Sequence, residues 1–215
     1  MNGDPEQNGE HQQPVDSEGR PVDRGIKIQK YYYLPCSVAR LTTLTPGGKI
    51  LYAVIKGLAG GNDLAGVSQG TLAKIAGTSE DRVWVWLWSS GYQGLIRIVP
   101  DRPCLRYCLP QVDERAGLIR IDGGIIRCKK FSQGEKLIRC YILWRQGSDG
   151  GCRQNYQEIA GELGLSYKWV YGTIKRLKAA GDIRPRGLNS DGWPVIECRG
   201  HRVPRSAPVA QYEGI

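Results

Sequence analysis

The residue types that most often carry catalysis or bind metal ions are scarce and poorly spaced in this sequence. The two histidines, His11 and His201, lie near opposite ends of the chain. Cys104 and Cys108 are four residues apart on an expected strand, which separates them by ~13 Å, too far to share a metal ion. We therefore expect no metal site, no cofactor and no catalytic residue of these types.

A run of three tyrosines, Tyr31–Tyr33, is the remaining candidate for a nucleophile, of the kind that nicks DNA. Such a nucleophile generally works beside a metal-binding histidine cluster or an arginine-rich partner set, and this chain lacks the histidines. A strand with alternating burial is the better interpretation of the tyrosines. The phosphate-binding motif G-x-x-x-x-G-K-[ST] is also missing. The sequence therefore predicts a protein that is not an enzyme.

Charge is the feature that indicates a partner. The chain has 215 residues, with 30 Lys and Arg against 21 Asp and Glu, a net charge of +9. The first 30 residues are acid-leaning, so the positive excess belongs to the rest of the chain, and it favours a polyanion such as nucleic acid. No apolar run approaches the ~20 residues of a membrane helix. The polar N-terminus and the odd number of cysteines favour a cytoplasmic location.

An internal repeat organises the elements that would carry this charge. Residues 72–79 align without gaps with residues 159–166, an offset of 87 (159 − 72), and in the same register Val83 matches Val170. Three expected helix starts recur at this offset, each a capping side chain before an apolar pattern of helical period. The capping residues are Thr45, Ser68 and Ser79 in the first repeat and Ser132, Asn155 and Ser166 in the second.

A β-hairpin is expected after the third helix of each repeat. In the first repeat, residues 96–99 and 105–107 flank a turn that contains two prolines. In the second, residues 183–188 and 193–196 flank the turn Asn189–Gly192. Each repeat is therefore expected to run strand, helix, helix, short turn, helix, hairpin.

This order of elements, with the residues that mark it, resembles the winged helix-turn-helix superfamily. The marking residues are Leu72, Ala73, Gly77, Thr78, Ser79, Val83, Leu87 and Gly94, and then Ile159, Ala160, Gly164, Leu165, Ser166, Val170, Ile174, Leu177 and Gly181. Leu34-Pro35 and Leu44-Thr45-Pro46 are similar to segments of winged-helix domains in bacterial plasmid and phage replication proteins and small regulators. The implied fold class is α+β, mainly helical, with two tandem winged helix-turn-helix domains related by the 87-residue repeat.

The resemblance and the composition together divide the chain into four segments. Residues 31–114 form the expected first winged-helix domain and residues 115–200 the second. Residues 1–30 and 201–215 are expected to be disordered tails, since they have few large apolar residues. The connection at residues 111–117 is short, so we expect the two domains to touch.

The resemblance implies that the third helix enters the major groove of double-stranded DNA and that the hairpin contacts the backbone or the minor groove. In the second repeat, Val170, Ile174 and Leu177 form the expected core stripe, which leaves a basic face with interleaved aromatic residues. The expected DNA-binding residues of this repeat are Ser166, Tyr167, Lys168, Trp169, Tyr171, Gly172, Lys175, Arg176, Arg184 and Arg186. A solvated, lysine-rich helix face is the alternative interpretation.

The third helix of the first repeat departs from this pattern. It begins with Glu80 and Asp81, which repel phosphate, and its expected core stripe is Val83, Leu87 and Ser90. The residues expected to form a protein-interaction surface, for a partner or against the second domain, are Trp84, Val85 and Trp88. The expected DNA contacts of this repeat lie on its hairpin and are Arg97, Arg102 and Arg106.

Two functions from different classes fit these features. The first is non-catalytic binding of double-stranded DNA, in the regulation of transcription or in the initiation of DNA replication on a plasmid, phage or other mobile element. The alternative is a protein-protein interaction module, in which degenerate winged helices act as a scaffold in a nucleoprotein complex. A continuous positive surface along residues 168–178 would favour DNA, and interruption by acidic residues would favour the scaffold.

Overall fold

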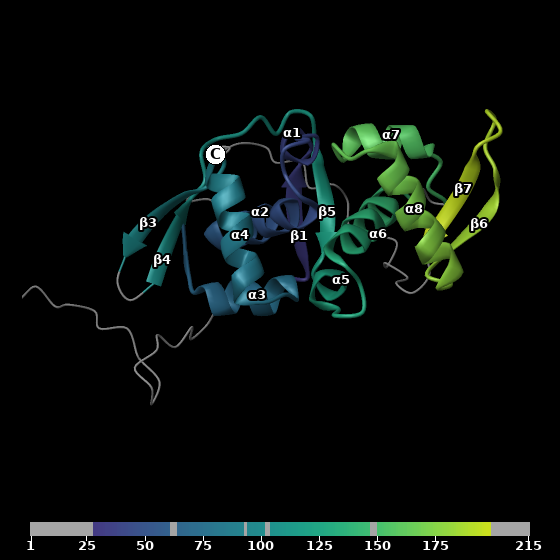
Figure 1. Cartoon of the computed structure of the whole chain (residues 1–215). Helices are drawn as coiled ribbons and strands as arrows, with labels where there is room; N and C mark the ends of the chain where they lie inside the picture. Colours follow the sequence, from purple (N-terminus) through teal and green to yellow (C-terminus); the bar gives the residue numbers. More distant parts are fainter. Residues whose placement is uncertain (1–27, 61–63, 93, 102–103, 147–149, 199–215) are drawn as a thin grey trace, which may run out of the picture.

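The computed structural model describes most of the chain (Figure 1), namely residues 28–60, 64–92, 94–101, 104–146 and 150–198. Nearly all of both predicted tails, with His11 and His201, lies outside these ranges, and so does Arg102. The fold is α+β, with helices and short antiparallel sheets. No helix within the described ranges is long and apolar enough to cross a membrane.

Both halves of the chain are built in a similar order. The first half contains β1 (Tyr31–Pro35), α1 (Cys36–Ala39), α2 (Pro46–Ala59), β2 (Leu64–Val67), α3 (Gln69–Ala76), α4 (Glu80–Tyr92), β3 (Arg97–Asp101) and β4 (Cys104–Cys108). The second half contains β5 (Leu118–Asp122), α5 (Gly123–Arg127), α6 (Gln133–Arg145), α7 (Tyr156–Glu162), α8 (Tyr167–Ala179), β6 (Ile183–Leu188) and β7 (Pro194–Cys198). From β1 to α4, each counterpart in the second half begins 87 residues later, β2 excepted.

The helix starts are defined by the expected capping side chains. Thr45 and Ser68 accept hydrogen bonds from the backbone amides of Gly48 and Thr71. Ser132 and Asn155 each form a reciprocal capping box with a glutamate three residues later. Because α4 and α8 begin directly after Ser79 and Ser166, all six helix starts lie where the sequence predicts them.

Three short elements were not expected from the sequence. They are the helices α1 and α5 and the strand β2. Strand β2 pairs with β4, so the first half has a three-stranded sheet, whereas its counterpart in the second half is a single bridge between Cys152 and Ile196. These elements are only four or five residues long, too short to produce a readable periodicity.

The two halves share a two-stranded antiparallel sheet at the centre of the molecule (Figure 1). Tyr31 pairs with Asp122, and the residues that correspond to them in the other half, Leu118 and Pro35, pair with each other. This reciprocal register is what an approximate two-fold relation between the halves produces. The buried side chains accordingly form one continuous cluster that includes residues of both halves.

Two fully buried lysines repeat this reciprocity. Lys49 of α2 donates a hydrogen bond to the carbonyl of Leu163, where α7 ends. Its counterpart Lys136 of α6 donates to the carbonyls of Ile126 at 2.7 Å and of Ala76 at 3.2 Å, where α3 ends. A cation at a helix C-terminus is favourable because the last carbonyls carry partial negative charge. A buried lysine of each half therefore stabilises the C-terminal end of a helix in the other half, α7 for Lys49 and α3 for Lys136.

Candidate nucleic-acid interface

Helix α8 presents a fixed outward face because its inner face is buried. Val170, Ile174 and Leu177 are at most 2% exposed, as the helical period predicts, and α8 packs against α6 and α7. Ser166 caps the helix by accepting a hydrogen bond from the amide of Trp169. The opposite side chains are therefore held toward solvent, with no freedom to exchange with the core.

Lys168 and Lys175 are the clearest cations of this face. Both are exposed, and neither has an ion-pair partner among the residues that the structure describes. Tyr167 and Tyr171 stack on each other beside them, with ring centroids 6.2 Å apart and planes 18° apart. A Cβ atom added at Gly172 would meet nothing closer than the Arg176 side chain, at 3.8 Å. The face is thus cationic and aromatic, with a bare stretch of backbone where a partner can approach closely.

Two residues predicted to bind DNA also serve the fold. Trp169 lies against Gly134, where an added Cβ atom would be 2.1 Å from the indole ring, so part of its surface is used in packing. Arg176 forms an ion pair with Glu135 at the start of α6, at 3.3 Å, and donates a hydrogen bond to Thr173. The sequence did not reveal the contacts with Gly134 and Glu135, because these two residues belong to α6, more than 30 residues away in the chain.

The two arginines of the second hairpin share one acidic partner. The guanidinium of Arg184 lies 2.7 Å from the carboxylate of Glu197 on β7, and that of Arg186 lies 3.6 Å from it. Side-chain exposure remains 49% for Arg184 and 41% for Arg186. The carboxylate raises the pKa of Arg184. The pair therefore offers about one net positive charge, not two.

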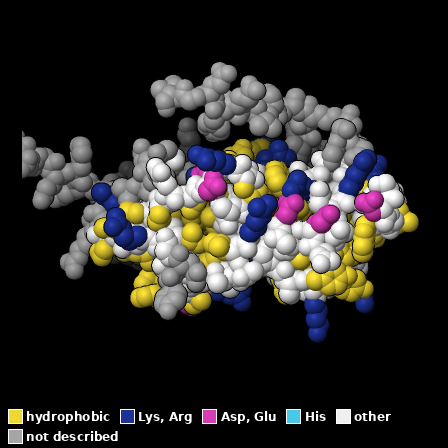
Figure 2. Space-filling model, turned by 90° about the horizontal axis from the view of Figure 1, so that it is seen from above, with side chains coloured by type: hydrophobic (Ala, Val, Ile, Leu, Met, Phe, Trp, Pro, Cys, Tyr) yellow, Lys and Arg dark blue, Asp and Glu magenta, His cyan; other side chains and the backbone are white. Residues whose placement is uncertain are grey.

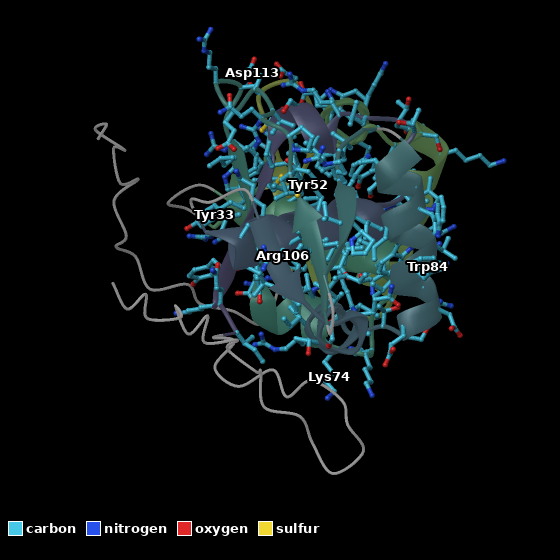
Figure 3. All side chains as sticks on the ribbon, turned by 90° about the vertical axis from the view of Figure 1, so that its left-hand side faces the viewer. Tyr33, Tyr52, Lys74, Trp84, Arg106 and Asp113 are labelled. Carbon is cyan, nitrogen blue, oxygen red and sulfur yellow. The ribbon has the colours of Figure 1, made fainter. Side chains whose placement is uncertain are left out.

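The cations of the first hairpin lie far from this face. Arg97 and Arg106 are exposed on β3 and β4, at the opposite end of the molecule from α8 (Figure 1). Seen from that end (Figure 3), Arg106 lies centrally while Trp84 of α4 lies at one edge. The structure therefore does not join Arg97 and Arg106 to the predicted contacts of the second half in one patch.

The equivalent helix of the first half, α4, presents an apolar surface. Trp84, Val85 and Trp88 are 42%, 63% and 62% exposed, and the two indoles meet edge to face with centroids 5.7 Å apart. The predicted core stripe of Val83, Leu87 and Ser90 is fully buried. Seen from above (Figure 2), yellow side chains gather at both ends of the lower edge, and dark blue side chains lie at both ends of the molecule and between them.

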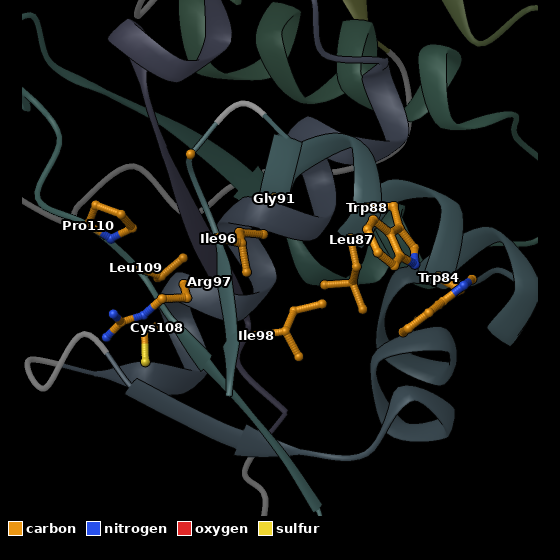
Figure 4. A pocket seen from close by; sticks show the side chains of 11 residues that line it. Trp84, Leu87, Trp88, Gly91, Ile96, Arg97, Ile98, Cys108, Leu109 and Pro110 are labelled. Atoms are coloured by element: carbon orange, nitrogen blue, oxygen red, sulfur yellow. The ribbon is translucent and has the colours of Figure 1, made fainter. Parts of the chain in front are cut away.

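The two tryptophans lie at one end of a groove of about 910 Å³ between α4 and the sheet of β3 and β4 (Figure 4). Ile96 and Ile98 form its floor, and Arg97 lies at the other end, beside Pro110. The described lining residues belong to the first half, and both tryptophans are exposed, so the structure does not support the alternative in which these tryptophans pack against the second domain. Their exposed surface is an apolar patch of the kind found at protein-interaction sites.

Sequence reasoning missed Tyr156, a buried residue that lies behind the α8 face and supports it. Tyr156 at the start of α7 lies 6.0 Å from Tyr171, ring centroid to ring centroid, and accepts a hydrogen bond from Lys178 at 2.8 Å. Tyr156, Tyr171 and Tyr167 thus form a row across two helices. Because Tyr156 and Tyr171 are 15 residues apart on different helices, helical periodicity gives no signal for their contact.

Comparison with known proteins finds no match to this chain. No model of a known protein family matches the sequence, and no curated protein is significantly similar to it. The function has to be inferred from the arrangement of side chains on the fold.

Proposed function

We propose that the protein binds double-stranded DNA without catalysing a reaction, through two tandem winged helix-turn-helix domains. Each half supplies the parts of that motif, namely three longer helices followed by a hairpin. The observation that carries the proposal is the exposed face of α8, where Lys168 and Lys175 have no acidic partner in the described chain and lie beside two stacked tyrosines. Such a face suits the edges and phosphates of a major groove.

The surface of α8 favours this proposal over a merely solvated helix face. Glu135 pairs with Arg176 and so interrupts the positive surface of residues 168–178 toward its C-terminal end, and Glu197 pairs with the two arginines of the hairpin, so acidic residues border the face. Between these borders, from Lys168 to Lys175, the helix itself contains no acidic residue. The charge is therefore concentrated where the third helix of this motif meets DNA.

The decisive experiment is selection of bound sequences from a random pool of duplexes, followed by affinity measurements on the enriched sequence. We expect enrichment of one motif, bound more tightly than scrambled DNA. Repeated copies of the motif at an origin of replication would identify an initiator, and a single copy at a promoter would identify a regulator of transcription. Failure of any duplex to bind at low salt would refute the proposal.

A second function, as a protein-protein interaction module, is favoured by one observation. The tryptophan groove of the first half is apolar and exposed, and Glu80 and Asp81 at the start of α4 repel phosphate. The two functions are compatible, because the groove and the α8 face lie in different halves. The first half would then dock a protein while the second half binds DNA.

A further inference from the structure

The hairpin of the second half carries an apolar side chain that the fold does not use. Leu188, the last residue of β6, is 70% exposed, more than any other large hydrophobic residue in the described chain. Strand β6 is exposed along its whole length after Ile183. In Figure 1 the hairpin stands beyond α8 at the end of the molecule, and residues of its tip line a pocket together with Asn155 and Glu158 at the start of α7.

The turn next to Leu188 is held rigidly. The side-chain oxygen of Asn189 accepts hydrogen bonds from the amides of Asp191, at 3.0 Å, and Trp193, at 2.8 Å. Its side-chain nitrogen donates to the carbonyl of Arg153 at 3.2 Å, which fixes the tip to the segment before α7. Gly192 adopts a φ of +77°, a conformation that suits glycine in such a turn. Leu188 is therefore presented in a defined position.

Cations precede this leucine on the same strand. Arg184 and Arg186 hold their guanidinium groups on the shared carboxylate of Glu197, still about half exposed. The register of the hairpin shifts between Pro185 and Gly187, and such a bulge bends a strand. The hairpin thus combines a charged base with an apolar end, whereas an isolated exposed leucine elsewhere on a surface would need no explanation.

This combination is the one that minor-groove proteins use. They hold the phosphates with cations and insert an apolar side chain between two base pairs, which unstacks the step and kinks the duplex by about 20–90°. Flexible steps such as TA cost least to open, so insertion produces a sequence preference without hydrogen bonds to bases. Asp191 at the tip is exposed and would oppose phosphate, which leaves Leu188 and not the turn as the inserting group.

We propose that Leu188 is a wedge that enters the minor groove and bends the duplex bound by α8. The inference rests on the proposed binding of double-stranded DNA. It assigns Leu188 as a specificity-determining residue for DNA shape, with Asn189 as the residue that positions it. A partner protein that packs on Leu188 is the competing explanation, and it predicts no effect of Leu188 on the shape of DNA.

The test uses the full chain and a short duplex of the enriched sequence, with donor and acceptor dyes at its two ends. Energy transfer should rise when wild-type protein binds, because bending brings the ends together. The Leu188→Ala variant should bind several-fold more weakly with little or no rise in transfer and an unchanged salt slope. Leu188→Ile should keep most of the bend, and Ile28→Ala, at an exposed apolar residue of the first half, should bend DNA as the wild type does.

A second readout locates the wedge. A duplex with 2-aminopurine at the flexible step should brighten on binding wild-type protein and stay dim with Leu188→Ala, because only an unstacked base fluoresces strongly. Bending by Leu188→Ala equal to that of wild type would overturn the inference, as would a straight duplex in the wild-type complex. Absence of any wild-type binding at low salt would overturn the proposed function as well, so the two failures are distinguishable.

Discussion

Lys168 and Lys175 differ from Arg176, Arg184 and Arg186 in what surrounds their charge. Each of the three arginines lies near a carboxylate, and a DNA phosphate has to compete with it. Lys168 and Lys175 have no such carboxylate partner, so a phosphate that binds them displaces only water. Because Lys168 lies in the first turn of α8, it is the residue that would reach a base edge when the N-terminal end of the helix enters the groove.

Replacing Lys168 by alanine should therefore change specificity. If Lys168 contacts a base edge, Lys168→Ala should cost roughly 1–3 kcal/mol on the preferred duplex and much less on a scrambled one. The measurement is fluorescence anisotropy titration of both duplexes at the same salt concentration. Equal losses on the two duplexes would show that Lys168 contacts only the backbone.

The matched control is Arg186→Ala, which removes a hairpin cation. We expect it to weaken binding to all duplexes about equally and to lower the salt slope by at most about one counterion. The loss is about one charge because Glu197 then neutralises Arg184, which leaves the hairpin without its net positive charge. A change in the ratio of preferred to scrambled affinity would contradict this role.

At the scale of elements, α4 and α8 are equivalent helices with different outer faces. In the 87-residue register, Trp84 corresponds to Tyr171 and Trp88 corresponds to Lys175. Helix α4 therefore has an apolar side chain where α8 has a cation. The two halves contain similar elements, but the outer faces of their third helices differ in polarity and charge.

Replacing Trp88 by alanine should affect protein association through the tryptophan groove and leave DNA binding by the α8 face unchanged. We expect Trp88→Ala to fold normally, since Trp88 is 62% exposed, and to bind duplex DNA within about twofold of wild type. Any association that depends on the groove, measured by sedimentation velocity, should weaken. The prediction would be wrong if Trp88→Ala lost as much DNA affinity as Lys175→Ala with folding and association unchanged.

The elements themselves were largely predictable from the sequence. Capping residues and helical periodicity are local signals, so they gave all six helix starts and the buried stripes of α4 and α8. What they could not give are contacts between distant segments, such as Trp169 on Gly134 or the carboxylate of Glu135 beside Arg176, which is 41 residues away in sequence. Those contacts depend on how helices pack, and they decide which candidate site residues are available to a partner.

At the scale of the whole molecule, the buried lysines connect the two halves. Lys49 and Lys136 lie in the helices at the centre, and each donates to carbonyls at the end of a helix in the other half. Helical periodicity did not predict the burial of these lysines, because a lysine in an amphipathic helix is normally expected to face solvent. The lysines fix α3 and α7, which in turn support the third helices.

Burial lowers the pKa of Lys49 to about 8, from an ordinary value near 10.5. Between these two pH values the unfolded chain binds more protons than the folded one, so this group makes the protein more stable as pH rises. We expect the stability of wild type minus that of Lys49→Met to rise by roughly 2–3 kcal/mol from pH 7 to pH 10.

Urea unfolding at several pH values measures this difference. The comparison with Lys49→Met is needed because burial raises the pKa of Cys152 and Cys198 to about 11, which lowers stability in the same pH range for both proteins. Parallel pH profiles for wild type and variant would show that Lys49 titrates normally in the folded protein.

The salt dependence of duplex binding tests most directly whether the α8 face binds DNA. Anisotropy titrations at several salt concentrations should give a linear fall of log affinity with log salt for the wild type. The variant with both Lys168→Ala and Lys175→Ala should lose more than tenfold in affinity and about two counterions from the slope. A wild type without salt-dependent affinity, or a double variant that binds like wild type, would contradict DNA binding by α8 and favour the interaction module.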